Sequence, residues 1–583
     1  MTGILMSDEI SRRTYLEALL AAGITASLAG CNTSQNSSEP ESPTNSSTET
    51  PNQAPHILTH DATPKDNGTA LTVSLEGEDD DGLSLARIEY GERTIEKSPE
   101  STSVALSEEL TDLGATDQDK TSGQVTFLLR DTAGRETRET VNPDETAPEL
   151  QTCTVEPTVN AGEIAVQLEG RDETGLEAAN VLVGEQTFVQ ESVSGQTTYS
   201  TDQRICLPET TRLQQNSVTA SVVDWNGNTT ETEGETYVRK YDAMTDTRLD
   251  IGVNYFTAGE SMFTNCLESG VETEPEVGAD EYGRPIRPET TTKHIDQMQG
   301  HGIGRVQFTF EGTRDTKNQL QTFLDSELVD VIDVEPTYYI SGPHRWTENA
   351  DFEQIVEEDM TYIREEFFAR ENAATFDGRP TFYVENAMHW VAVRDRLLET
   401  WDDLGAFADE LRSRLTVDGT EPFMVAGLGS QGHRYVEAGD YGPYHKELAR
   451  GFDAVMNLTA GPVFRNAPEK QATQEDALAW LEQNYRGHSA FAAENDKEFF
   501  PRVIPGFDTR ANICWGNDER IPRDPDFFGT NLQMANEHRT AKRMNVFTWN
   551  DFTEGTAIEP GTWRGNDYGT AYLERIQTLQ KAN

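Results

Sequence analysis

A gapless internal repeat with a period of 93 residues is the feature that most restricts how this chain can fold. The segment 71–94, LTVSLEGEDDDGLSLARIEYGERT, aligns with 164–187, IAVQLEGRDETGLEAANVLVGEQT (164 − 71 = 93). The same offset aligns the later turn at 131–134, DTAG, with 224–227, DWNG. A constant offset across a whole unit predicts two tandem copies of one domain.

The two copies are predicted to span 54–146 and 147–240. Each contains short runs of alternating apolar residues, separated by Gly, Asp and Asn turns. This pattern favours an all-β antiparallel sandwich and resembles the immunoglobulin-like modules of many exported microbial proteins. The turn at 79–82, DDDG, has two interpretations, a calcium loop or a solvated turn. It lacks the spaced acids and the distant Glu of an EF-hand, so we predict a solvated turn and no metal site.

From about residue 247 to 583 the pattern changes to short apolar runs that alternate with helix-period segments. Eight strands are predicted, at 251–255, 305–310, 329–334, 381–384, 423–426, 454–457, 502–505 and 545–549. Eight strands that alternate with helices over this length predict an α/β fold, the (β/α)₈ TIM barrel. An open doubly wound sheet is the alternative, but no glycine-rich phosphate loop follows the first strand.

The net charge of −55 excludes one class of partner and suggests an environment. Acidic residues number 102 against 47 basic ones, and they are spread along the whole chain. Such a charge repels phosphate backbones, so no nucleic acid partner is expected. Dispersed acidity suits a protein kept soluble in high salt, which screens the self-repulsion, and predicts a halophilic archaeon as the source.

The first 53 residues read as targeting and spacer segments. Residues 1–31 carry a twin-arginine pair, Arg12-Arg13, and a short apolar run that ends in LAGC, which resembles the lipobox of twin-arginine lipoproteins. Residues 32–53 are almost all polar and predict a disordered linker. We therefore expect folded export, a lipid on Cys31, and attachment to the outer face of the membrane.

The other four cysteines fall in two predicted domains. Cys153 and Cys206 lie in the second sandwich, and Cys266 and Cys514 lie in the barrel. In an exported protein two disulfides are expected from this count, although spacing alone does not fix the geometry.

Polar and aromatic residues follow the predicted strands, at the face of a barrel where active sites are built. Aromatic rings stack on sugars while carboxylates and amides bind hydroxyls, so the set predicts a carbohydrate site. The expected substrate-binding residues are Asn254, Tyr255, Glu311, Glu335, Tyr338, Glu385, Asn386, Trp390, Asn457, Asp508, Arg510, Trp549 and Asn550.

Strand 8 leads into two carboxylates three positions apart, Asp551 and Glu554. Sugar cleavage requires one protonated carboxyl to help the leaving oxygen depart and one ionised carboxyl as base or nucleophile. The alternative interpretation is a solvated loop in an acidic protein.

Residues 549–560, WNDFTEGTAIEP, resemble the strand 8 motif of glycoside hydrolase family 99, the endo-α-mannosidase and endo-α-mannanase family. PGFDTR at 505–510, GFDA at 451–454 and VEP at 334–336 also have counterparts there. The likeness covers most of 249–583. It implies Glu554 as general acid and Asp551 as the base that deprotonates the sugar 2-hydroxyl, with net retention and without a cofactor or metal.

Three departures from the family motif keep other functions open. Asp551 replaces a Glu and is one methylene shorter, Phe552 replaces a Trp, and Thr553 replaces a residue that is often His. A displacement of about 1 Å costs on the order of a hundredfold in rate. The leading hypothesis is an exported endo-acting glycoside hydrolase. The alternatives are a catalytically silent cell-surface carbohydrate-binding protein and a polysaccharide-assembly enzyme.

Overall fold

A computed structural model describes most of the chain from residue 53 onward. The described residues are 53–65, 70–111, 113, 124–144, 146–184, 186–256, 266, 273–277, 286–339, 350–385, 397–428, 443–457, 472–510, 512–513 and 520–582. The predicted signal, with Cys31, and all but the end of the linker lie outside them. Within the described part, no helix is both long and apolar enough to cross a membrane.

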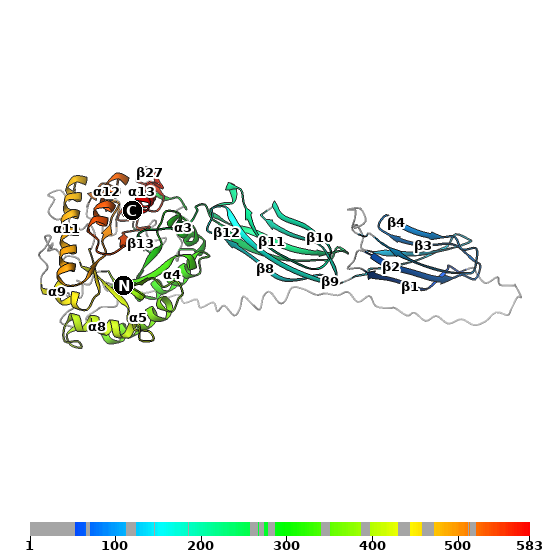
Figure 1. Cartoon of the computed structure of the whole chain (residues 1–583), viewed down its shortest axis with the longest axis horizontal. Coiled ribbons are helices and arrows are strands. Elements are labelled where there is room, and N and C mark those ends of the chain that lie inside the picture. The colour runs from blue at the N-terminus through cyan, green and yellow to red at the C-terminus, as the bar shows by residue number, and fades with distance from the viewer. Residues whose placement is uncertain are drawn as a thin grey trace, which may run out of the picture. The chain divides into compact units, whose positions relative to one another are not determined.

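The first repeat unit forms two antiparallel sheets around an apolar core. One sheet has the order β1-β2-β5 and the other β4-β3-β6-β7. The strands are β1 (His56–Lys65), β2 (Ala70–Glu78), β3 (Leu83–Tyr90), β4 (Arg93–Lys97), β5 (Ser103–Leu110), β6 (Val125–Asp131) and β7 (Glu136–Val141) (Figure 1). In β2, Val73 and Leu75 are fully buried whereas Glu76 and Glu78 are exposed, because one face of the strand packs against the other sheet.

The second unit repeats this arrangement with longer, continuous strands. Adding 93 to the bounds of β2 and β3 gives 163–171 and 176–183, the two ends of β9 (Glu163–Val183). Likewise β10 (Gln186–Cys206) spans the counterparts of β4 and β5. The remaining strands are β8 (Glu149–Pro157), β11 (Gln214–Asp224) and β12 (Thr229–Val238). The repeat is therefore present in the element order, while the immunoglobulin-like class and the domain boundaries stay predictions.

The expected disulfide in the second unit is wrong. Cys153 and Cys206 are both free. Cys153 pairs with Leu168 of β9, and Cys206 pairs with Glu163 of the same strand. Five residues along a strand correspond to about 17 Å, whereas a disulfide needs Cβ atoms within about 4.5 Å. Cys266 is disulfide-bonded, and Cys514 lies outside the described residues.

Residues 250–546 contain a parallel sheet that curls until its two ends meet, as in a TIM-like barrel. The order is β21-β20-β19-β18-β16-β15-β13-β25-β22. The two end strands, β21 (Glu498–Phe499) and β22 (Arg502–Val503), are separated in sequence only by Phe500 and Pro501. They therefore act as one interrupted seventh strand. The other strands are β13 (Asp250–Tyr255), β15 (Arg305–Phe310), β16 (Asp333–Tyr338), β18 (Arg379–Val384), β19 (Phe423–Leu428), β20 (Ala454–Asn457) and β25 (Arg543–Val546).

In the described part, an α-helix follows each of the eight strand positions, and these helices surround the sheet (Figure 1). They are α3 (Pro288–Gly300), α4 (Arg314–Leu324), α5 (Phe352–Ile363), α8 (Leu404–Leu415), α9 (Pro443–Arg450), α11 (Gln474–Glu494), α12 (Pro525–His538) and α13 (Ala571–Ala582). Several begin at a side-chain cap: Thr313, Asp351 and Asp403 each accept a hydrogen bond from a backbone N–H of the first turn. Such caps satisfy N–H groups that have no partner within the helix.

The third barrel strand starts later than the sequence pattern predicted. The expected strand at 329–334 is a 3₁₀ turn at Val329–Val331, and β16 begins at Asp333. The alternating run VDVIDV predicted a strand that ended at Val334, with Pro336 beyond it. Pro336 instead lies inside β16, opposite Phe308 of β15. Glu335 is consequently a residue of the strand and not of the loop after it.

The barrel interior combines a charged network with an apolar cluster. Arg305 donates from Nε to Asp250 (2.9 Å) and pairs through Nη1 with Glu335, and neither Arg305 nor Glu335 is exposed to solvent. Arg543 donates to the second oxygen of Asp250 (2.5 Å). Gly252 makes room for this network, because a Cβ there would lie 2.5 Å from Arg305 Nη1. The apolar cluster consists of Tyr383, Phe423, Val425, Ala454, Met456 and Phe500.

Candidate active site

The turn that follows β25 carries both predicted catalytic acids. Beyond Val546, the chain stays attached to its neighbours: Phe547 N donates to Val503 O (2.9 Å), and Trp549 N donates to Asn254 O (2.8 Å). The loop then folds back on itself, with Ile558 N bonded to Thr548 O (3.1 Å). Asp551 and Glu554 are thereby held at the carboxyl end of the eighth strand, where barrel enzymes place their reacting groups.

The Asp551 carboxylate is built into this turn. Its Oδ1 accepts hydrogen bonds from Thr553 N (3.0 Å), Thr553 Oγ1 (2.7 Å) and Glu554 N (3.0 Å). The side chain is buried, and this burial raises the pKa of Asp551. All three bonds reach the same oxygen, which leaves Oδ2 outside the hydrogen bonds of the turn. Because Asp is one methylene shorter than Glu, its carboxylate can bond the backbone N–H groups two and three residues further on.

Glu554 is half-buried at the end of the same turn. Its carbonyl oxygen accepts a hydrogen bond from Asp508 N (2.7 Å), which fastens the turn to the seventh strand's loop. Gly555 follows with φ of 61°, and a Cβ at this position would lie 3.1 Å from both Asp508 N and Trp563 Cζ2. Glycine is therefore required for the turn to close against Asp508.

Asp508 and Arg510 form one ion pair beside this turn. Arg510 donates from Nε to Asp508 Oδ1 (2.8 Å) and from Nη2 to Oδ2 (2.6 Å). Asp508 is buried, whereas the Arg510 side chain keeps 30% of its area exposed. The pair thus presents part of its guanidinium to solvent, next to the turn that holds Glu554.

Glu385 lies at the end of β18 and is paired across the barrel. Arg502 of β22 donates from Nη1 and Nη2 to the two carboxylate oxygens, each at 2.5 Å. The Glu385 side chain keeps 13% exposure and Arg502 none, and the guanidinium lies 4.9 Å from the Phe547 ring centre. A bidentate pair of this kind fixes both side chains. Arg502 was missed from the sequence, where the only signal is a charge inside the apolar run FFPRVIPGF.

Three predicted residues do not reach the strand-end face. Glu335 is buried in the Arg305 network, and Thr381 Oγ1 donates to its Oε2 (2.5 Å). Tyr255 bonds His294 of α3 through its hydroxyl (2.9 Å), and Tyr338 bonds Asp359 of α5 (2.7 Å). Neighbouring residues of a strand point to opposite faces, so Asn254 points into the barrel while Tyr255 points to the helices.

The remaining predicted residues mainly hold the loops together. Asn550 bonds both the N–H and the C=O of Phe256, each at 2.9 Å. Asn457 bonds the backbone of Arg502 in the same two-sided way, at 3.0 and 2.7 Å. Trp549 is fully buried, with its ring 5.6 Å from that of His294.

Of the last four predicted residues, the structure describes two. Asn254 is buried, with Oδ1 at 3.5 Å from Thr309 Oγ1, and Glu311 follows β15 as a half-buried residue. Asn386 and Trp390 lie outside the described residues.

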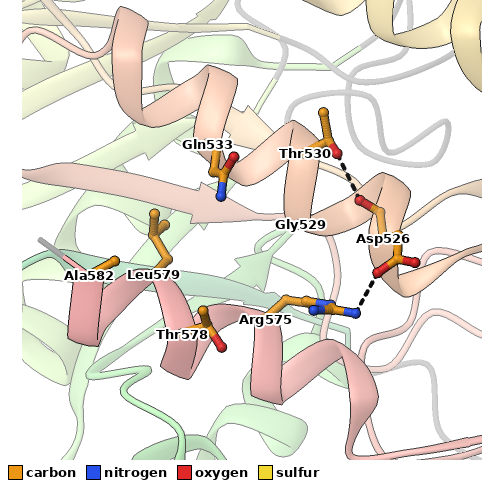
Figure 2. A pocket seen from close by; sticks show the side chains of 8 residues that line it. All are labelled: Asp526, Gly529, Thr530, Gln533, Arg575, Thr578, Leu579 and Ala582. Atoms are coloured by element: carbon orange, nitrogen blue, oxygen red, sulfur yellow. Dashed lines mark hydrogen bonds and ion pairs between the residues drawn. The ribbon is translucent and has the colours of Figure 1, made fainter.

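Two pockets in the described part lie away from this turn. One, of about 240 Å³, lies between α12 and α13, where Arg575 pairs with Asp526 (Figure 2). The other, of about 680 Å³, is lined by Asp330, Asp333 and Arg370 near the start of β16. Neither contains a predicted site residue.

No protein-family model and no curated protein matches this sequence. Among solved structures, the chain is similar to a protein described as glycoside hydrolase-like (16% identity, 57% of this chain, 94% of that chain, TM-score 0.44). It is also similar to the GH99 endo-alpha-mannosidase of Bacteroides thetaiotaomicron (17% identity, 58% of this chain, 98% of that chain, TM-score 0.42). At these TM-scores, a function has to be inferred from the side chains themselves.

Proposed function

We propose that this protein is a glycoside hydrolase that cleaves α-mannoside-like or related polysaccharide linkages, endo-acting and with retention. The observation that carries the proposal is the turn after β25, which holds Asp551 and Glu554 together at the carboxyl end of the parallel strands. Glycosidases need two carboxyl groups in different protonation states. The resemblance of residues 549–560 to the family 99 motif gives each of them a role.

In this mechanism the sugar 2-oxygen attacks the anomeric carbon while Glu554 protonates the departing glycosidic oxygen, and water then opens the resulting 1,2-anhydro sugar with net retention. Asp551 accepts the proton of the sugar 2-hydroxyl at Oδ2, while Oδ1 stays bonded to the turn. Burial raises the pKa of Asp551, which makes its ionised carboxylate a stronger base. The partly exposed guanidinium of Arg510 and the Glu385 carboxylate, paired with Arg502, are the groups that would bind sugar hydroxyls.

The test is product release by the full chain in molar salt, from α-mannan oligosaccharides and a panel of microbial polysaccharides. Glu554→Gln keeps the shape but removes the proton donor, and should lower the rate by about 10²- to 10⁴-fold. Glu482→Gln, at an exposed helix position, is the matched control and should leave the rate unchanged. Cleavage that survives in Glu554→Gln would remove Glu554 from the mechanism.

A carbohydrate-binding protein without turnover is the second candidate. The observation that favours it is the three hydrogen bonds to Asp551 Oδ1, which give this side chain a structural role. In that case neither the wild type nor Glu554→Gln cleaves, although both bind the polymer, and Asp551→Glu gains activity because the longer side chain reaches the substrate.

The proposed location is the outer face of the membrane of a halophilic archaeon, after twin-arginine export and lipid attachment at Cys31. The support is the sequence pattern of residues 1–31 and the net charge of −55. Cys31→Ser should release the protein from the membrane fraction into the medium. Equal membrane retention of this variant would contradict the lipid anchor.

A further inference from the structure

Three buried carboxylates meet where the first repeat unit leads into the second. Asp144 precedes β8, Asp172 lies in β9, and Asp224 ends β11; they are 6%, 5% and 0% exposed. One carboxylate oxygen of each lies within 4.8 Å of those of the other two. Among the described residues, none of the three forms an ion pair with Lys, Arg or His. Three buried like charges are costly unless a cation or protons neutralise them.

The hydrogen bonds around the cluster orient these carboxylates without neutralising them. Thr174 Oγ1 bonds Asp172 Oδ1 (2.6 Å) and also Asp144 Oδ2, and Asn228 Nδ2 donates to Asp224 Oδ2 (2.7 Å). These donors are neutral hydroxyl and amide groups.

An amide oxygen at the same place points independently to a ligand. Asn226 is 8% exposed, and its Oδ1 is buried without a hydrogen-bond partner among the described residues. Asn226 contacts two residues of the cluster. Its Nδ2 donates to the main-chain oxygen of Asp144 (2.6 Å), and its backbone N–H donates to Asp224 Oδ1 (2.9 Å). A buried carbonyl oxygen without a hydrogen-bond partner, on a side chain that bonds the Asp144 main chain, is the kind of ligand atom that a hard cation takes up.

We propose that Asp144, Asp172, Asp224 and Asn226 bind a calcium ion. Carboxylate and amide oxygens in an irregular arrangement suit Ca²⁺, whereas Mg²⁺ requires near-octahedral geometry and keeps several waters. Asp144 belongs to the end of the first repeat unit, and the other ligands belong to the second. The ion therefore restrains the segment that connects the two units. This site is separate from the barrel and does not depend on its activity.

The first repeat unit supplies a matched control. Asp79 and Asp131 correspond to Asp172 and Asp224 (172 − 79 = 93 and 224 − 131 = 93), and both are buried. The counterpart of Asp144 is Pro51, so this unit lacks the third carboxylate at that position (144 − 51 = 93). Asp79 and Asp172 each accept a hydrogen bond from the backbone N–H two residues further on, so substitutions there remove equivalent carboxylates, without and with the proposed ion.

The experiment titrates the full chain with Ca²⁺ by calorimetry in about 1 M NaCl, where the Debye length is about 3 Å and diffuse binding to the acidic surface is suppressed. Asp172→Asn should weaken binding by at least about tenfold, because ligand charge sets calcium affinity. Asp79→Asn should leave the affinity within about twofold of the wild type, since no ion is proposed in the first unit. Equal affinities for the two variants, or no binding by the wild type, would overturn the proposal.

Terbium luminescence tests where the ion lies. Trp225 lies between the ligands Asp224 and Asn226 in sequence, so it should sensitise Tb³⁺ bound there. Added Ca²⁺ should displace the Tb³⁺ and abolish its emission. The emission should also be absent in Trp225→Phe, although this variant should keep the calorimetric Ca²⁺ affinity of the wild type. Tyr90 lies 6.4 Å from Trp225 between ring centres, so tryptophan alone is excited, and emission that then persists in Trp225→Phe would place the ion elsewhere and refute the assignment.

Discussion

Neutralising Glu335 should destabilise the barrel without acting on substrate binding. Its two carboxylate oxygens contact Arg305 and Arg543, at 3.6 Å for Arg543, and its side chain is fully buried. Two guanidinium groups face the carboxylates of Glu335 and Asp250 in this network. Glu335→Gln leaves one buried positive charge uncompensated, a change that costs about 3–5 kcal/mol. Such a loss is a large part of the ~5–15 kcal/mol that stabilises a typical domain.

Urea unfolding followed by tryptophan fluorescence measures this loss. Trp225 is the only one of the eight tryptophans outside 247–583, so the signal reports chiefly on the barrel. The control is Glu482→Gln, which removes an exposed i,i+4 pair with Arg486 worth about 0.3–0.5 kcal/mol. If Glu335→Gln is no less stable than this control, the charged network does not stabilise the barrel. Weaker carbohydrate binding by the same variant would make Glu335 a substrate-binding residue.

Three further predictions concern single sites. Gly555→Ala should destabilise the protein more than Gly378→Ala. Both glycines have positive φ (61° and 72°), which costs another residue about 1–2 kcal/mol, but of the two only position 555 has atoms within 4 Å of an added Cβ. Equal urea midpoints for the two variants would contradict the close contact. Asp333 is exposed at the start of β16, yet partial desolvation and the charge of Asp250 raise its pKa to about 6, so its ionisation destabilises the fold as pH rises from about 4 to 6. Because solvent screens an exposed group, the effect should be small. Asp333→Asn should be slightly more stable than the wild type at pH 7 and lose that advantage at pH 4, and a pH-independent difference would contradict this assignment. Iodoacetamide should alkylate the exposed, free Cys206 without reductant and the disulfide-bonded Cys266 only after reduction, as mass spectrometry can show.

Local patterns predicted the elements but not always their ends. The offset of 93 reappears in the bounds of β9 and β10, because a repeated sequence repeats its alternation and turns. The third strand was misplaced because the alternating run at 329–334 begins with a 3₁₀ turn, and this shifted boundary moved Glu335 from the loop into the core. Asp551 and Glu554 share one turn, as their spacing in one short segment predicted, while their catalytic roles stay predictions.

What the sequence determined by itself is the tandem repeat, the alternation of strands and helices, and the two acids of the turn after β25, since each depends on residues near one another in the chain. Tertiary structure decided the pairings between distant residues. It separated Cys153 from Cys206, joined Glu385 to Arg502 and turned Tyr255 toward α3. It also brought Asp144, Asp172 and Asp224 to within 4.8 Å. Such contacts depend on strand register and on which face a side chain occupies, and neither is encoded in residue spacing alone.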